Sequence, residues 1–246
     1  MVSVGVGLIP SDVSACTDSM RGKPMETSRD LKAESLVREE SLIEPGHFGD
    51  SKDNIVIIKD FVSPLDLEHM ATFLPHLNKF DNPMETEYDD DGVCIYDASY
   101  WWDRVCMSDT LRGVNPFVWD MVYGYVEKMR EVIEDKFGVT CYSRNPCLVR
   151  WLPGLEQAPH ADKQLNDGSP NPFPTYDINS IIYWNNEFEG GQFYYPEHGI
   201  ELEIEPGMAV AHPGDINYLH GIKTVTSGVR WTTPAFYTIT DLHTGE

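Results

Sequence analysis

The clearest pattern of apolar and polar positions begins at residue 54, where a strand precedes a helix. The run NIVIIKDF (54–61) is rich in β-branched residues and predicts the strand. In the following SPLDLEHMATFL, Ser63 suits an N-cap, Pro64 suits the first helical position and Asp66 completes the spacing of a capping box. We therefore expect a helix that begins at Pro64 and ends near Pro75.

A longer helix is predicted from about residue 117 to residue 137, where apolar side chains recur at every fourth position. The members of this stripe are Phe117, Met121, Tyr125, Met129, Ile133 and Phe137, and they are flanked by Val118, Val122 and Val126. A stripe of this kind is typical of a helix packed against a sheet. We interpret it as core and not as a binding surface.

From residue 147 onward, short apolar runs alternate with Gly, Pro and Asn. The predicted strands are CLVRWL, INSIIYWN, GQFYY, IELEIE, MAVAH, GIKTV and RWTTPAFYTI. In IELEIE, apolar residues alternate with glutamates, which is typical of a half-buried antiparallel strand. The order of elements predicts an α+β, mainly β fold. We expect a double-stranded β-helix core of the jelly-roll or cupin-like type, with supporting helices on its N-terminal side.

Residues 1–52 mix Ser, Gly, Pro and charged residues with little periodicity. We expect them to form a loosely ordered N-terminal extension before one domain at residues 53–246. No apolar run is long enough to cross a membrane, and the first residues lack the basic start of a secretory signal. The five cysteines contain no CxxC pair, which favours reduced thiols. Together these features predict a cytoplasmic protein that does not associate with membranes.

The net charge of -22 makes nucleic acid a poor partner, because an acidic surface repels phosphate. The segment DNPMETEYDDDG (81–92) alone carries six acidic residues and no basic one. Two interpretations of this segment stay open. It is either a solvated loop or a loop that attracts a basic peptide.

The tripeptide His160-Ala161-Asp162 follows the predicted strand CLVRWL and a turn, and His220 lies 60 residues further on. On a strand, residues i and i+2 share a face, so His160 and Asp162 can point the same way. Two imidazoles and one carboxylate on one face of a metal are typical of non-haem iron sites with open positions. His198 and His212 are alternatives to His220, since His212 also stands at the end of a predicted strand.

Arg230 lies 10 residues after His220, at the start of the last predicted strand. A guanidinium group binds a carboxylate through two parallel hydrogen bonds. A dicarboxylate that chelates a metal at one end would need such a group at the other. The alternative is an ordinary surface arginine beside Glu203 or Glu205.

The region from Cys147 to Ile239 resembles the catalytic barrel of the prolyl 4-hydroxylase-like iron(II)/2-oxoglutarate-dependent dioxygenases. The residues that carry this resemblance occur in the family's order, and they are WLPG, HAD, YWN, EGGQFYYP, IEPGMAVAHPGD, LHGI and GVRW. The stretch NIVIIKDFVSPLDLEHMATFL also resembles that family's opening strand and helix. Residues 53–246 would then form a catalytic domain.

The resemblance implies a role for each matching residue. His160, Asp162 and His220 would hold Fe(II), while Arg230 and Tyr183 would bind the distal carboxylate of 2-oxoglutarate. No catalytic residue beyond the metal ligands is implied, and ascorbate is an implied reductant. The chain departs from the family at Trp151, where a tyrosine is usual, and at Phe193, where a threonine is common.

The implied reaction is hydroxylation of an unactivated C–H bond by dioxygen, with release of succinate and CO2. The leading substrate is a prolyl residue of a peptide or protein, and the alternatives are a lysyl side chain or a free amino acid. A cupin-like binding protein without catalysis is the alternative from another class. The loop at residues 163–177 is a candidate lid, and Trp101, Trp102 and Trp231 are candidate walls of a substrate site.

Overall fold

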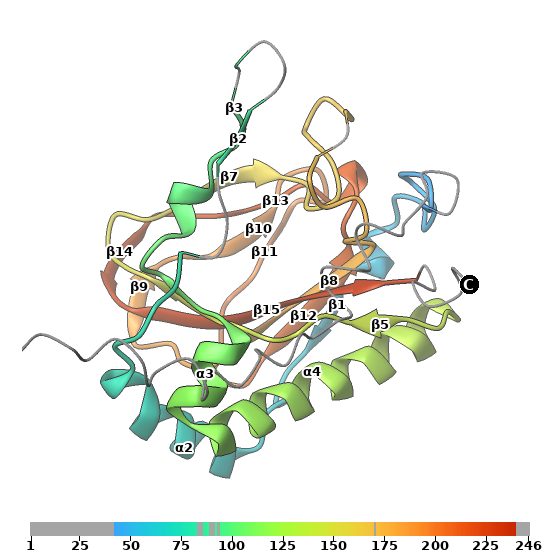
Figure 1. Cartoon of the computed structure of the whole chain (residues 1–246). Coiled ribbons are helices and arrows are strands. Elements are labelled where there is room, and N and C mark those ends of the chain that lie inside the picture. Colours follow the sequence, from blue (N-terminus) through green and yellow to red (C-terminus); the bar gives the residue numbers. More distant parts are fainter. Residues whose placement is uncertain (1–41, 83–85, 89–91, 93, 170, 240–246) are drawn as a thin grey trace, which may run out of the picture. The chain divides into compact units, whose positions relative to one another are not determined.

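A computed structural model of the chain describes residues 42–82, 86–88, 92, 94–169 and 171–239. They belong to one compact unit that spans residues 38–246. Most of the described elements are antiparallel strands, and the described α-helices all lie before strand β5 in the chain (Figure 1). The prediction of an α+β, mainly β fold is therefore confirmed.

Two antiparallel sheets form the body of this unit (Figure 1). The larger sheet has the order β1 (Val56–Ile58), β12 (Ala209–Pro213), β8 (Ile178–Tyr183), β15 (Arg230–Thr238), β6 (Leu148–Trp151) and β4 (Val105–Cys106), with β5 (Tyr142–Ser143) paired to β15. The smaller sheet has the order β11 (Ile200–Glu201), β10 (Phe193–Tyr195), β13 (His220–Ile222) and β7 (Gln157–His160). Two further pairs join β9 (Phe188–Gly190) to β14 (Val225–Gly228) and β2 (Glu87–Tyr88) to β3 (Cys94–Tyr96).

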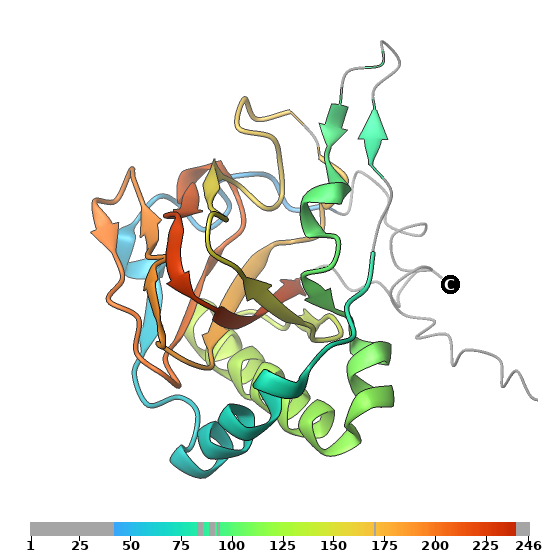
Figure 2. The same cartoon turned by 90° about the vertical axis from the view of Figure 1, so that its left-hand side faces the viewer.

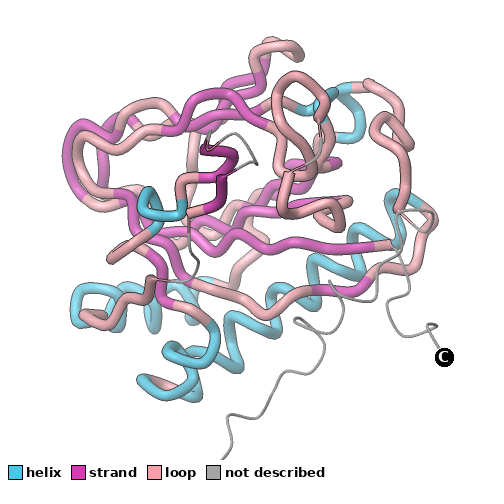
Figure 3. The backbone as a smooth tube through the Cα atoms, turned by 45° about the horizontal axis from the view of Figure 1, so that its top comes forward, coloured by secondary structure: helices cyan, strands magenta, loops and turns pink. Residues whose placement is uncertain are grey.

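The helices cover one face of the larger sheet, and the smaller sheet lies over the other (Figures 2 and 3). The α-helices of the described chain are α2 (Pro64–Phe73), α3 (Ser108–Val114) and α4 (Pro116–Phe137). Short 3-10 turns occur at η2 (Lys52–Asn54), η3 (Leu74–His76), η4 (Ala98–Trp101) and η5 (Ile216–Tyr218).

Because both faces of the larger sheet are covered, neighbouring residues of one strand enter two different cores. On β8, Ile182 packs against the helices, whereas Tyr183 packs between the sheets. On β6, Leu148 and Val149 divide in the same way. This double burial explains why the strands read as continuous apolar runs. The core between the sheets is the one that surrounds the site described below.

Both predicted helices are present, with two corrections. The Ser63 hydroxyl caps α2 by accepting the Asp66 N–H, as the sequence predicts. The buried side of α4 follows Val118, Val122, Val126, Met129 and Ile133. The predicted stripe was therefore off by one position at its start, and Phe117 is 58% exposed. Helix α3 was missed because its seven residues are too few to show a helical period.

The strand predictions need corrections at two places. Only Ile200–Glu201 of the alternating IELEIE forms a strand. The predicted GIKTV contains the end of β13 and the start of β14, two strands in different sheets.

Residues 42–52, which the sequence assigns to the extension, contact the rest of the unit. The Gly46 N–H donates to Asp215 Oδ2 over 2.8 Å, and the Tyr218 hydroxyl donates to the Gly49 carbonyl over 2.9 Å. The rings of Phe48 and Phe137 lie 4.9 Å apart. Residues 1–41 lie outside the described residues, so the boundary at residue 53 stays a prediction.

The four cysteines within the described residues, Cys94, Cys106, Cys141 and Cys147, form no disulfide. Among the helices that the structure describes, none has the length and apolar character needed to span a bilayer.

Candidate metal and cosubstrate site

Three predicted metal ligands meet between the sheets, although they come from different elements. His160 is the last residue of β7, Asp162 follows in the next turn, and His220 is the first residue of β13. Strands β7 and β13 are neighbours, and their pairing places His220 directly opposite His160. The possible ligand atoms of the three residues all lie within 4.8 Å of one another.

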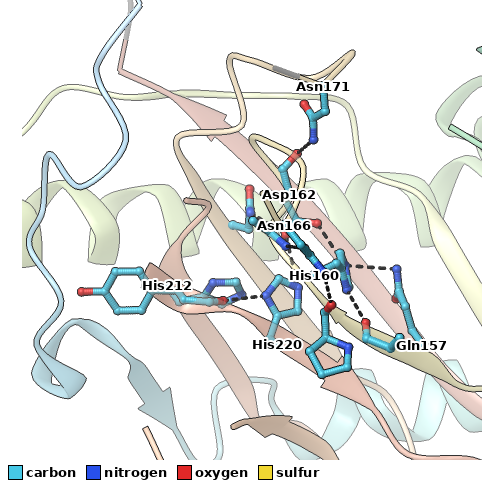
Figure 4. A network of polar contacts seen from close by, with 12 residues as sticks. Gln157, His160, Asp162, Asn166, Asn171, His212 and His220 are labelled. Carbon is cyan, nitrogen blue, oxygen red and sulfur yellow. Dashed lines mark hydrogen bonds and ion pairs between the residues drawn. The ribbon is translucent and has the colours of Figure 1, made fainter. Parts of the chain in front are cut away.

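The carboxylate of Asp162 lies between the two imidazoles (Figure 4). Its Oδ1 atom is 3.4 Å from His160 Nε2, and its Oδ2 atom is 3.4 Å from His220 Nε2. The two imidazole rings are 4.4 Å apart. Three donor groups thus converge from one side, which leaves the opposite side free for other ligands.

Backbone carbonyls fix which imidazole nitrogen faces the centre. His160 Nδ1 lies 3.0 Å from the Ala158 carbonyl, and His220 Nδ1 lies 3.0 Å from the Tyr218 carbonyl. Since a carbonyl can only accept, each Nδ1 carries the hydrogen and each Nε2 presents a lone pair. This arrangement of the distal nitrogen is common for imidazoles that bind metals.

The electrostatics of the three groups favour the charge states that a metal needs. Burial opposes the charged form of Asp162, but His220 and His160 outweigh it and hold the pKa of this carboxyl below its usual range. Burial holds the pKa of His220 well below its usual value. At neutral pH the site therefore offers one carboxylate and at least one neutral imidazole.

Neither alternative histidine belongs to the converging group of ligand atoms. His198 Nε2 is 2.9 Å from the Asn217 carbonyl, and its ring stacks on Tyr218. His212 is buried beside His220, with ring centres 4.5 Å apart, but it is not part of the group of converging ligand atoms. His212 Nδ1 lies 2.9 Å from the Pro213 carbonyl. The geometry thus favours His220 over both alternatives as the second imidazole ligand.

Arg230 is 1% exposed, and its three guanidinium nitrogens have no hydrogen-bond partner among the described residues. Its guanidinium carbon lies 5.1 Å from the centre of the Tyr183 ring; the two side chains interact electrostatically, and no other described residue is a partner of the Tyr183 hydroxyl. Burial raises the pKa of Tyr183 to about 12, so the phenol keeps its hydrogen and can donate it. The alternative of a surface arginine beside Glu203 or Glu205 is wrong, because Lys59 binds Glu205 at the surface and Arg230 is buried.

A buried, unpaired guanidinium costs several kcal/mol unless an anion joins it. Arg230 and Tyr183 together present the donors that a carboxylate accepts. Two imidazoles and a carboxylate suit Fe(II), and three open positions suit a bidentate 2-oxo acid with one position to spare. The residues of this chain therefore fit both iron and 2-oxoglutarate.

Trp151 forms the wall beside Arg230. It pairs with Arg230 across β6 and β15, and the guanidinium carbon is 5.5 Å from its ring centre. Trp101 packs edge-on against the Trp151 ring at 5.9 Å, and Arg104 lies over the same ring at 4.5 Å. The indole thus excludes water from the guanidinium where the resembled family usually has a tyrosine.

The EGG motif is explained by close packing around Arg230. A side chain at Gly190 would lie 2.1 Å from the Thr224 carbonyl, and one at Gly191 would lie 3.1 Å from the Arg230 side chain. Both glycines also have positive φ angles, which other residues rarely adopt.

Other residues expected near the site have different positions. Trp231 faces the helical side of the larger sheet and stacks on Phe80, so it is core. The ends of the loop 163–177 are joined by an ion pair of Lys163 and Asp177, 2.5 Å apart. Within the acidic segment, Asp81 accepts the Met107 N–H and the Thr110 hydroxyl hydrogen. Residues 83–85 and 89–91 of that segment lie outside the described residues, so its binding role stays a prediction.

Three polar side chains around the site were not anticipated. The Asn179 amide donates to Asp162 Oδ2 over 2.6 Å, and the Gln157 amide nitrogen is 3.1 Å from His160 Nε2. The Tyr195 hydroxyl is buried and has no partner among the described residues. A polar residue within the apolar run INSIIY was the available signal for Asn179, whereas nothing in the sequence marks Gln157.

In fold, the chain is similar to solved 2-oxoglutarate- and iron(II)-dependent oxygenases. A prolyl hydroxylase from Trichoplax adhaerens, solved with a peptide fragment of hypoxia inducible factor, has a TM-score of 0.53 and 14% identity, covering 89% of this chain and 96% of that one. An oxidoreductase of the 2OG-Fe(II) oxygenase family from Burkholderia pseudomallei has a TM-score of 0.50 and 16% identity, covering 76% and 86%. At such identities these structures show a shared fold.

In sequence, the chain is similar to prolyl 3-hydroxylases. It is 28% identical to prolyl 3-hydroxylase 1 of Rattus norvegicus over 146 residues, and 27% identical to prolyl 3-hydroxylase 2 of Homo sapiens over 147 residues. Each match covers 50% of this chain, and the chain spans only about a fifth of the length of these relatives (20% and 21%). No protein-family model matches the chain. The resemblance to prolyl hydroxylases inferred from the motifs is confirmed.

Proposed function

We propose that this chain is an iron(II)- and 2-oxoglutarate-dependent dioxygenase that hydroxylates a prolyl residue in a peptide or protein. The observation that carries the proposal is the buried guanidinium of Arg230, which has no acidic partner among the described residues and lies in the same interior as His160, Asp162 and His220. A metal site alone would not require this cation. A dicarboxylate cosubstrate requires both.

In this proposal, His160, Asp162 and His220 hold the iron, and Arg230 and Tyr183 bind the distal carboxylate of 2-oxoglutarate. The bound iron and 2-oxoglutarate supply the oxidation of an unactivated C–H bond by dioxygen, with release of succinate and CO2. The contact of Arg230 with the distal carboxylate fixes the orientation of the cosubstrate, because a planar guanidinium binds a carboxylate in few orientations. Trp151 and the surrounding core keep water from this contact.

The proposed architecture is a double-stranded β-helix. The two antiparallel sheets face each other around an apolar interior, and the helices support the outer face of the larger sheet. This arrangement supports the expectation of a jelly-roll core. His160 and His220 belong to the smaller sheet, Asp162 follows it in the next turn, and Tyr183 and Arg230 belong to the larger sheet.

The proposed substrate is supported by the sequence relatives, which are prolyl 3-hydroxylases, and by the Trichoplax neighbour, which was solved with a peptide. The chain spans a fifth of those relatives, so their substrates reach this chain only as a proposal. Lysyl side chains and free amino acids are the matched comparisons in the test below.

The test is an anaerobic titration of the protein with Fe(II), with and without 2-oxoglutarate, followed by visible charge-transfer absorption. We expect a band that requires iron, 2-oxoglutarate and His160, with His160→Ala as the control. Peptides that contain proline, peptides that contain lysine, and free amino acids are then compared for succinate release and for the gain of one oxygen atom. Absence of the band in folded protein would leave a cupin-like binding protein instead.

A further inference from the structure

Asn179 is the polar residue of β8 that reaches the proposed metal ligands. It is 2% exposed, and its amide nitrogen lies 2.6 Å from Asp162 Oδ2. The group that faces the carboxylate must be the NH2 group, because an amide oxygen in that place would repel it. Asn179 therefore donates a short hydrogen bond to one particular oxygen of Asp162.

The position of Asn179 is fixed on both sides. Its neighbours in the sheet are His212 on β12 and Phe236 on β15, paired with it by the strand register. On another side, a Cβ atom at Gly214 would lie 2.8 Å from the Asn179 amide nitrogen, so the backbone at Gly214 passes very close. The Gly214 carbonyl also accepts the Asp162 N–H over 3.0 Å. The backbone at Gly214 thus contacts both the Asn179 amide and the segment that carries Asp162.

The two oxygens of Asp162 consequently have different surroundings. Oδ2 accepts the Asn179 hydrogen bond, while Oδ1 lies 3.4 Å from His160 Nε2, a nitrogen that carries no hydrogen. A carboxylate can bind a metal through one oxygen or through both. A donor held at 2.6 Å on Oδ2 leaves Oδ1 as the oxygen that is free to coordinate.

We propose that Asn179 is a positioning residue that holds Asp162 as a one-oxygen ligand and so keeps a coordination position open beside the cosubstrate. This inference rests on the proposed function. Two imidazole nitrogens and one carboxylate oxygen leave three of six positions. A bidentate 2-oxo acid takes two of them, and the third stays available for dioxygen. A second oxygen from Asp162 would fill that last position.

The test uses nitric oxide as a probe of the open position on Fe(II). Asn179→Leu removes the donor while keeping the branched shape of the side chain, Asn179→Ala is a second variant in case leucine prevents folding, and Ser180→Ala is the matched control on the same strand. Ser180 contacts the Tyr237 hydroxyl instead of the site. In the wild type and in Ser180→Ala, we expect iron and 2-oxoglutarate to give the charge-transfer band and to bind nitric oxide.

In the Asn179 variants we expect the band to persist while the affinity for nitric oxide falls about tenfold or more, as for other residues that orient metal ligands. Wild-type affinity for nitric oxide in a folded Asn179 variant would overturn the proposal. Loss of iron from the Asn179 variants would also overturn the proposal. Asn179 would then be needed for iron to bind at all, and not for the number of Asp162 oxygens that coordinate it.

X-ray absorption of protein loaded with cobalt(II) alone counts the coordinating oxygens without any cosubstrate. We expect one more oxygen in the Asn179 variants than in wild type. If the wild type gives no 2-oxoglutarate band, the proposed function fails, and the cobalt measurement still decides the role of Asn179.

Discussion

His160 and His220 face each other across the neighbouring strands β7 and β13, with imidazole centres 4.4 Å apart. Sixty residues separate them in the chain, and the pairing of two short strands brings them together. Their proximity depends on strand register, since a shift by one residue would turn one imidazole out of the interior.

His220→Ala should weaken iron binding strongly, whereas His212→Leu should leave iron binding unchanged. Removal of His220 leaves two converging donors, whereas His212 lies outside the group of ligand atoms. We expect iron affinity to fall about a hundredfold or more for His220→Ala. Titration with Fe(II) under anaerobic conditions measures both variants. If folded His212→Leu loses iron while His220→Ala retains it, His212 is the ligand and His220 is not.

Arg230→Met should weaken the binding of 2-oxoglutarate while leaving iron binding intact. Removing one partner of a buried charge pair costs about 2–5 kcal/mol, so we expect a loss of about thirtyfold or more. Tyr183→Phe should cost about 1 kcal/mol, the net value of one hydrogen bond. Calorimetric titration of iron-loaded protein with 2-oxoglutarate gives both values.

The control for this pair is Arg112→Met, because Arg112 is exposed on α3 and lies over the ring of Trp119, away from the site. If wild type and Arg230→Met bind 2-oxoglutarate with equal affinity, the cosubstrate does not bind at Arg230.

The sequence predicted the order of elements well, because their signals are local. The Ser63 cap and the apolar period of α4 lie within single segments, and the structure contains both helices. The strands around Tyr183 and Arg230 were predicted from runs of β-branched and aromatic residues. The assignment of iron-binding and cosubstrate-binding roles to these residues stays a prediction until ligands are titrated.

The features that escaped prediction depend on contacts between distant segments. Strand β7 reads QAPH, which has neither alternation nor β-branched residues, and it exists because β13 pairs with it. Asn179 meets Asp162 only because β8 packs beside the turn that contains Asp162. Trp231 was expected near the substrate, but it lies in the core between the larger sheet and the helices. It follows Arg230 directly on β15, and neighbouring residues of a strand point to opposite faces of the sheet.

Lys163→Met should destabilise the fold strongly. Lys163 and Asp177 are buried and 2.5 Å apart, and Lys163 also donates to the Ile43 carbonyl over 2.8 Å. Breaking one partner of a buried ion pair costs about 3–5 kcal/mol, because the other charge stays unpaired. Adding Asp177→Asn to Lys163→Met should cost less than the sum of the single changes. Urea unfolding of the wild type, the two single variants and the double variant measures the coupling energy between Lys163 and Asp177. Strictly additive losses of unfolding free energy would show that the ion pair contributes no coupling energy.

Asp66→Asn should destabilise the contact between α2 and α4 in a pH-dependent way. Asp66 Oδ2 accepts hydrogen bonds from Tyr125 and Ser63 over 2.6 and 2.7 Å, and these bonds lower the pKa of Asp66. Because the pKa is lower in the folded state, the stabilisation is complete above the unfolded value of about 3.9 and disappears as the pH falls through the folded value. We expect a loss of about 1 kcal/mol at pH 7, typical of a capping or hydrogen-bonding residue, and a vanishing difference in strong acid. Urea unfolding across this pH range measures it, with exposed Glu68→Gln as the control. A difference that grows on acidification would mean that the charged form of Asp66 is not the stabilising one.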